Sequence, residues 1–258
     1  MARTVTTQIL PPATAAWENV LHRRHVPPPQ EGRDGYRYFR QCLRWEFGFT
    51  CAFCLCHESD LALYGIEGSG LTGVEHFVPC TTDPARVNDY TNCFYACRFC
   101  NLDRATRANL DPESGGLLLN PCDDVWARHF ERTGDELAPG AQDLDARYTH
   151  QTYNLDHPRK VSMRRFRRET LETYLAVLQD GPRLYERLMT SAIETAEPTL
   201  VSEAESLAAY IRQAYDFLAH YSVLPEDRRC PCLCGDETLC VIPEMLRGQS
   251  LELKPPVL

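Results

Sequence analysis

Two Cys-x-x-Cys pairs constrain the fold of this chain more than any other feature of its sequence. The first pair is Cys51 and Cys54, and the second is Cys97 and Cys100. This spacing lets both thiolates of a pair point at one ion, and two pairs complete the tetrahedral shell of four sulfurs that zinc prefers. The sequence therefore predicts a structural zinc ion that joins two distant segments of the chain.

Two further features leave the metal chemistry open. Cys56 stands two residues after Cys54 and could replace it as a ligand. A cluster near the C-terminus could hold a second zinc ion, or its thiols could stay without metal or form a partial site that another residue completes. The members of this cluster are Cys230, Cys232, Cys234 and Cys240.

Composition favours a globular protein in a reducing compartment. The chain has 258 residues and is 43% hydrophobic, enough for a medium domain with its own core and a smaller second one. No apolar run approaches the roughly 20 residues that span a bilayer, and the N-terminus lacks the apolar core of a secretory signal. We therefore expect a cytoplasmic protein without membrane association, in which the thirteen cysteines bind metal and do not form disulfides.

Periodicity and turn residues predict an α+β fold. Short strands are expected over residues 74–78 and 92–96, and a helix over residues 101–110 follows the second strand. Two antiparallel strands and a helix, closed by zinc, form a ββα element. The other expected elements are a helix over 36–47, loops over 111–147, a strand over 148–155, and helices over 161–179, 183–196 and 202–221.

Three regions follow from this order of elements. We expect an N-terminal extension over residues 1–35, a zinc-stabilised ββα domain over 36–130, and a mainly helical region over 131–258. The last region carries a basic helix and the cysteine-rich tail. Pro182 and Pro198 are expected to end its first two helices, because proline lacks the backbone N–H that a helix interior needs.

The segment between the two cysteine pairs resembles the HNH endonuclease family. Glu75 and His76 open a Glu-His-Phe-Val-Pro run, Asn92 precedes the second cysteine pair, and Asn101 directly follows it. In that family an acidic residue or a histidine precedes a histidine, an asparagine stands in mid-motif, and a histidine or asparagine closes the motif. The resemblance covers residues 44–104 and implies a ββα-metal (His-Me finger) core that hydrolyses phosphodiester bonds.

The resemblance implies a role for each of these residues. His76 would be the general base that takes a proton from water, since the pKa of histidine lies near neutral pH. Glu75 and Asn101 would supply oxygen ligands to one Mg²⁺ or Mn²⁺ ion, and Asn92 would brace the loop and orient the histidine. Glu75 stands where the zinc-bearing subtype most often has aspartate, which leaves the metal preference open.

The chain as a whole is acidic, with a formal net charge of −9. Binding to nucleic acid would therefore depend on a local cluster of positive charge. The family often has a lysine three residues after the closing asparagine, where this chain has an arginine. Residues 159–168 carry six cations in a predicted helix, whose alternative role is a solvated face paired with acidic residues. The residues expected to contact phosphate, with DNA as the expected substrate, are Arg104, Arg164, Arg167 and Arg168.

Segments after the core are similar to a group of stand-alone bacterial HNH proteins, some of which come from phage-defence loci. These segments are residues 118–124, 129–130 and 148–156. The resemblance implies kinship and leaves open whether a regulatory protein partner controls the activity. His129, in the second segment, could serve the site or make a structural hydrogen bond.

The sequence thus favours a metal-dependent HNH endonuclease with structural zinc and a catalytic Mg²⁺ or Mn²⁺ ion. Two rival hypotheses stay open. The site could have decayed in a protein that only binds nucleic acid or acts as an adaptor, in keeping with the acidic net charge and with Glu75. The scaffold could also serve other metal-assisted chemistry on a small molecule, which a closed pocket over His76 would favour.

Overall fold

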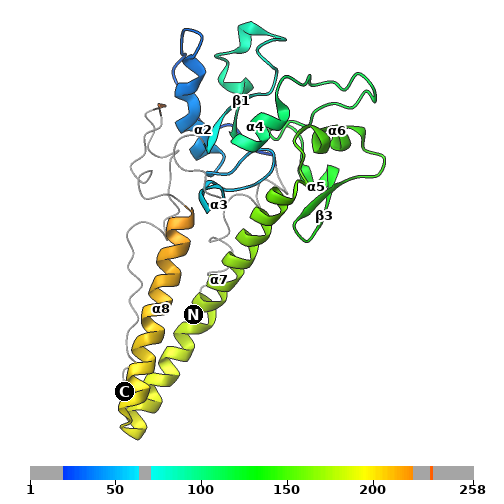
Figure 1. The fold of residues 1–258 in the computed structure, drawn as a ribbon. Helices are drawn as coiled ribbons and strands as arrows, with labels where there is room; N and C mark the ends of the chain where they lie inside the picture. The colour runs from blue at the N-terminus through cyan, green and yellow to red at the C-terminus, as the bar shows by residue number, and fades with distance from the viewer. Residues whose placement is uncertain (1–19, 64–70, 223–232, 235–258) are drawn as a thin grey trace. The chain divides into compact units, whose positions relative to one another are not determined.

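The chain divides into two compact units of different character (Figure 1). The computed structural model describes residues 20–63, 71–222 and 233–234. Of these, the residues up to Phe166 together with 233–234 form one unit, called here the cysteine unit. Residues 167–222 form the other, called here the helical unit. The fold is α+β, with small hairpins, a buried four-cysteine cluster and long C-terminal helices.

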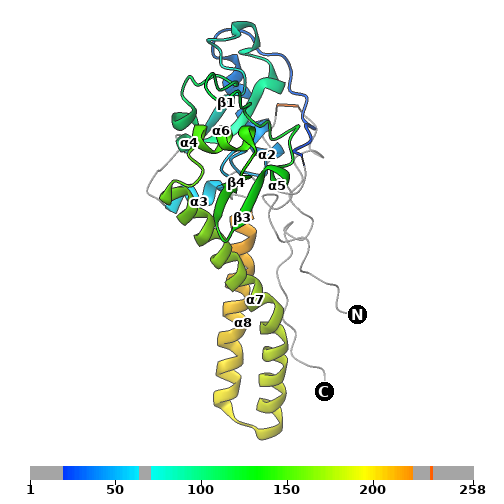
Figure 2. The same ribbon diagram turned by 90° about the vertical axis from the view of Figure 1, so that its right-hand side faces the viewer.

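The cysteine unit contains a two-stranded antiparallel sheet followed by a helix (Figure 2). β1 (Thr72–His76) pairs with β2 (Cys93–Cys97) so that His76 lies opposite Cys93. α4 (Arg98–Arg104) begins directly after β2 and ends at Ala105, whose φ of 45° is left-handed. The predicted strand–strand–helix order is therefore present, although the helix begins earlier and ends sooner than the expected range 101–110.

A buried carboxylate ties this hairpin to two helices. Glu58, the first residue of α3 (Glu58–Leu63), pairs with Arg44 of α2 (Arg40–Glu46) at 2.6 Å. The same carboxylate accepts a hydrogen bond from Thr72 Oγ1 in β1 at 3.1 Å and another from the Tyr95 hydroxyl in β2. One buried charge thus satisfies donors from α2, β1 and β2, which fixes their relative positions.

The segment predicted to be loops over 111–147 contains regular structure. α5 (Trp126–His129) leads into a hairpin of β3 (Phe130–Thr133) and β4 (Glu136–Pro139). Gly134, with a φ of 64°, lies in the tight turn between the two strands. Periodicity missed these elements because each is only four residues long.

The prediction of a strand over residues 148–155 is wrong, because the chain forms the helix α6 (Leu144–Thr152) there. Asp143 begins this helix: its side chain accepts a hydrogen bond from the Ala146 N–H at 2.8 Å. Tyr148, Thr149 and Thr152 are buried, at the three- and four-residue spacing of one helical face. The N-terminal cap and this spacing outweigh the strand preference of tyrosine and threonine.

The two helices predicted over 161–179 and 183–196 form one helix, α7 (Pro158–Thr195), with Pro182 inside it. Proline in a helix interior costs about 3 kcal/mol. Packing against α8 (Pro198–Ser222) on both sides of Pro182 compensates for this cost, since Leu178 and Tyr185 contact the same buried cluster around Ile211. The predicted helix over 202–221 is confirmed, with four more residues at its start.

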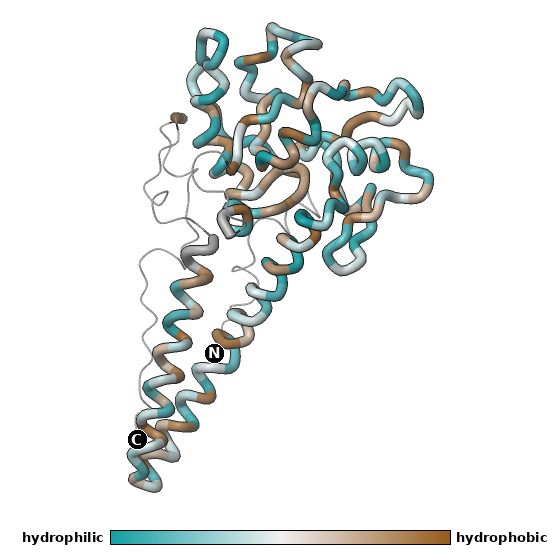
Figure 3. The backbone as a smooth tube through the Cα atoms, viewed as in Figure 1, coloured by the Kyte–Doolittle hydropathy of each residue, from teal (hydrophilic) through white to brown (hydrophobic). Residues whose placement is uncertain are grey.

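Within the helical unit, α7 and α8 lie side by side (Figures 1 and 2). Apolar and polar residues alternate along both helices in Figure 3, and Tyr174 stacks on Phe217 with ring centroids 4.3 Å apart. Gly181 permits the close approach, because a Cβ there would lie 2.7 Å from Ile211 Cγ1. No helix that the structure describes is long and apolar enough to span a membrane.

Replacing Gly181 tests this helix packing. Gly181→Val should lower the free energy of unfolding by about 1–3 kcal/mol, because the added side chain overlaps buried Ile211. The control is Arg183→Val, an exposed position on the same helix. Urea unfolding followed by circular dichroism measures both, and equal stability of the two variants would contradict the packing described here.

Candidate functional site

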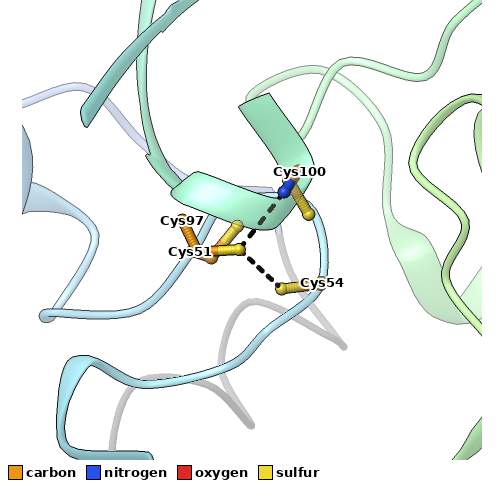
Figure 4. A group of neighbouring side chains, drawn as sticks. All are labelled: Cys51, Cys54, Cys97 and Cys100. Atoms are coloured by element: carbon orange, nitrogen blue, oxygen red, sulfur yellow. Dashed lines mark hydrogen bonds between the residues drawn. The ribbon is translucent and has the colours of Figure 1, made fainter. Parts of the chain in front are cut away.

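The four cysteines of the two pairs converge on one point inside the cysteine unit (Figure 4). The four sulfur atoms all lie within 4.8 Å of one another, and all four residues are buried. Cys54 Sγ and Cys97 Sγ are 3.6 Å apart. Sulfurs bound tetrahedrally at about 2.3 Å from zinc lie about 3.8 Å from one another. The donor set and its spacing therefore fit a structural zinc ion.

The first cysteine pair lies in a turn that selects Cys54 over Cys56 as ligand. The Leu55 N–H donates to the Cys51 carbonyl at 3.1 Å, and Leu55 adopts a left-handed φ of 62° that reverses the chain. Both thiols of the pair then face the cluster. The Cys56 sulfur lies 3.8 Å from the carbonyl oxygens of Cys54 and Lys160. It also interacts with the Cys54 thiol, but it is not among the four sulfurs that lie within 4.8 Å of one another.

The second pair belongs to the start of α4. Cys97 is the N-cap residue, and its sulfur accepts a hydrogen bond from the Cys100 N–H at 3.4 Å. Burial raises the pKa of the Cys100 thiol, and the neighbouring thiols add to the shift. Burial opposes ionisation of Cys54 as well, but hydrogen bonds from the surrounding thiols lower the pKa of Cys54 overall. A cation is therefore needed to hold all four thiols ionised.

Lys160 supplies positive charge beside this cluster, a role that the sequence did not reveal. It belongs to the basic stretch predicted to face DNA, yet it is buried, and its Nζ lies 2.7 Å from Asp103 Oδ2. Burial opposes the charge, but nearby Cys100 and Cys54 and the hydrogen bond to Asp103 raise the pKa of Lys160 overall. No local sequence signal separates a buried lysine of this kind from a solvated one.

Glu75 faces α4 from the second half of β1. Gly73 and Glu75 share one face of the strand because side chains alternate, and a Cβ on Gly73 would lie 3.6 Å from Asn101 Nδ2. Glu75 Oε1 lies 3.9 Å from Arg104 Nε. Burial raises the pKa of Glu75 to about 8, although the Arg104 guanidinium opposes the shift. Glu75 and Asn101 thus place a carboxyl group and a side-chain amide near the same face of β1. Once the carboxyl is ionised, its oxygens and the amide oxygen are donors that suit a hard divalent cation.

His76 is held by a backbone carbonyl. Its Nε2 lies 2.8 Å from the Val87 carbonyl oxygen, and a carbonyl can only accept, so Nε2 carries the hydrogen and Nδ1 keeps a lone pair. The Tyr36 ring packs edge-on against the imidazole with centroids 4.6 Å apart. Burial lowers the pKa of His76 below its usual value, against the opposing effect of the Val87 hydrogen bond, so the ring is neutral near pH 7.

Asn92 joins the two ends of the loop between β1 and β2. Its Oδ1 accepts a hydrogen bond from the Val78 N–H at 2.7 Å, and its Nδ2 donates to the carbonyls of Val78 at 3.1 Å and Arg86 at 3.2 Å. The Phe77 N–H donates to the Asn92 carbonyl at 2.9 Å. These bonds fix the loop that presents the Val87 carbonyl to His76.

The arginines predicted to contact phosphate are largely buried. Arg104 is fully buried and donates to the Phe77 carbonyl at 3.0 Å and to Asn109 Oδ1 at 2.8 Å. Arg164 is buried and donates to the carbonyls of Asp135 and Leu155. The prediction is wrong for these two residues, because their guanidinium groups satisfy internal carbonyls and do not reach the surface.

The other two predicted phosphate contacts lie in the helical unit. Arg167 is also buried, like Arg164 on the same helix. Arg168 remains partly exposed and pairs with Glu172 at 3.1 Å, the pairing proposed as the alternative role of this stretch. His129 bonds Asp143 Oδ2 at 2.8 Å.

The cysteine-rich tail is described only in part, since Cys230, Cys232 and Cys240 lie outside the described residues. Within the parts of the chain that the structure describes, histidine, cysteine and acidic side chains gather at ligand spacing in two groups. One is the four-cysteine cluster and the other includes Cys234. Glu75 belongs to neither, so a cation there would have Glu75 and Asn101 as its protein ligands and would need substrate or water oxygens to complete its shell.

Comparison of this chain with protein-family models, with curated proteins and with solved structures finds no match.

Substituting neighbouring cysteines tests the assignment of the zinc ligands. Cys54→Ser should lower the zinc content by about one ion per chain, because three thiolates bind zinc more weakly than four. Cys56→Ser, which removes a buried thiol of the same turn, should keep that ion. Metal analysis of the purified variants measures the difference, and zinc loss in Cys56→Ser alone would show that the ligand register is wrong.

Proposed function

We propose that this chain is a metal-dependent endonuclease of the HNH type that hydrolyses phosphodiester bonds, with DNA as substrate. The observation that carries the proposal is the tautomer of His76, which its hydrogen bond to the Val87 carbonyl fixes. A histidine at the end of β1 has its Nε2–H engaged by the Val87 carbonyl and its Nδ1 lone pair available. The hairpin that holds this histidine continues directly into α4, and the four-cysteine cluster lies at that junction.

In the proposed mechanism His76 is the general base. Its Nδ1 takes a proton from the water that attacks phosphorus, a contribution of about 10²–10⁴-fold to the rate. The lowered pKa of His76 keeps the imidazole neutral, and therefore able to accept a proton, at neutral pH. The Val87 carbonyl fixes the orientation of the ring and stabilises the positive charge that it gains.

Glu75 and Asn101 would hold the divalent ion. The ion supplies positive charge to the phosphate when bound. Glu75 is buried and its pKa is raised to about 8, so near pH 7 a divalent ion would displace the proton of the carboxyl group when it binds there. Asn92 acts through the loop: its bonds to Val78 and Arg86 keep the segment that carries Val87 in place, so it is a positioning residue.

One contact favours a second candidate function, binding of nucleic acid without cleavage. Arg104 Nε lies 3.9 Å from Glu75 Oε1, and its positive charge favours the ionised form of that carboxyl group. In a decayed site this ion pair would replace the divalent ion, and the four-cysteine cluster would serve the fold alone. The two functions differ in whether Mg²⁺ or Mn²⁺ produces cleavage.

A cleavage assay tests the proposal. The intact protein should cut plasmid DNA with Mg²⁺ or Mn²⁺ and not with chelator, and single-stranded DNA and RNA run beside it define the substrate. His76→Ala should lower the rate by about 10²–10⁴-fold, because the base is lost. His22→Ala, at an exposed histidine in the cysteine unit, should cleave like the parent protein.

The zinc content of both variants should equal that of the parent, which separates loss of chemistry from loss of fold. Full activity of His76→Ala would refute the mechanism. Binding of nucleic acid by the parent protein without cleavage of any substrate under either metal would select the second candidate.

A further inference from the structure

Three side chains with metal-binding atoms meet at a place that shares no residue with the four-cysteine cluster. His25, Cys42 and Cys234 put their ligand atoms within 4.8 Å of one another, and Cys234 Sγ lies 3.3 Å from His25 Nδ1. His25 and Cys42 are buried and Cys234 is half-buried. All three belong to the cysteine unit, although they come from the N-terminal segment, from α2 and from the C-terminal part of the chain.

The position of His25 follows from a carboxylate on α2. Glu46 Oε1 accepts the backbone N–H groups of Arg24 at 2.5 Å and His25 at 3.0 Å, and Glu46 Oε2 pairs with Arg23 at 3.0 Å. Cys42 and Glu46 are four residues apart on α2 and therefore share one face of the helix. The helix that holds the backbone of His25 thus also places a thiol beside its imidazole.

The Cys42 sulfur accepts a hydrogen bond from a backbone amide. The Leu233 N–H donates to Cys42 Sγ at 3.2 Å. The same kind of bond occurs in the four-cysteine cluster, where the Cys100 N–H donates to Cys97 Sγ at 3.4 Å. A donor of this kind favours the ionised thiol, and the thiolate is the form that binds metal.

We propose that His25, Cys42 and Cys234 bind a second zinc ion. Zinc is commonly bound in proteins by cysteine thiolates and histidine imidazoles. Two thiolates and one imidazole would fill three of the four positions of its tetrahedral shell. His25 binds through Nδ1, the ring nitrogen that faces the Cys234 sulfur. This set differs from the one predicted from the tail alone, because Cys234 draws its partners from distant parts of the chain.

The ion would join both terminal regions to α2. Residue 25 and residue 234 are separated by most of the chain, so one shared ion closes a very long loop, and its binding energy contributes directly to folding of the cysteine unit. The proposal is independent of the proposed nuclease activity, since none of the three ligands belongs to the site around His76.

Counting zinc by native mass spectrometry under reducing conditions tests the proposal. The full-length protein should carry about two zinc ions per chain, and Cys234→Ser and His25→Ala should each retain about one, since each loses a ligand of one site only. Cys80→Ser, at a half-buried cysteine outside both groups, should retain both ions. Trypsin should also cut after exposed Arg24 faster in Cys234→Ser than in Cys80→Ser, because the ion no longer holds His25.

Two results would overturn the proposal. One is a single zinc ion in the parent protein that Cys234→Ser leaves in place. The other is a disulfide between Cys42 and Cys234 in the protein as isolated, detected by peptide mapping without reduction. If His25→Ala loses both ions through misfolding, the number of zinc ions in Cys234→Ser tests the proposal instead. Cys234 is only half-buried, so its replacement disturbs the core less.

Discussion

The folding of the cysteine unit depends on the four-cysteine cluster, which holds the first cysteine pair against the start of α4. Cys51 and Cys54 lie in the turn before α3, whereas Cys97 and Cys100 end β2 and begin α4. Zinc binding to such a set releases about 10–16 kcal/mol in small zinc-finger peptides, as much as the whole free energy of unfolding of an ordinary domain, about 5–15 kcal/mol. Without a bound cation, the four buried thiols would be largely un-ionised and would lack this stabilising binding energy.

The geometry of the candidate site follows from this junction. Because α4 begins at the cluster, its next residues lie along β1, with Asn101 beside Gly73 and Arg104 beside Glu75. The cluster residues take no part in the proposed chemistry. They hold the turn of the first cysteine pair against the end of β2 and the first turn of α4.

The sequence was most informative where chemistry imposed a spacing. The cysteine pairs predicted the cluster, the residues between them predicted two short strands, and the residues after Cys100 predicted a helix. It was least informative where packing decided the outcome. Pro182 is tolerated because α8 packs on both sides of it. Arg104 and Arg164, expected to meet phosphate, lie in the interior because backbone carbonyls there accept their hydrogen bonds. Neither cause leaves a local pattern, since both depend on segments distant in sequence. The bond from His76 to the Val87 carbonyl is equally invisible, because any residue at position 87 supplies a carbonyl.

In an active site Glu75 binds a divalent ion, whereas in a decayed site it stays paired with Arg104. The most direct measurement is therefore whether a divalent ion occupies the position beside Glu75. Crystals of the full chain with Mn²⁺ and a DNA duplex, measured at the manganese absorption edge, would locate the ion. We predict an anomalous peak between Glu75 and Asn101, with His76 Nδ1 facing the scissile phosphate. DNA bound with no peak there, and with Glu75 still paired to Arg104, would contradict it.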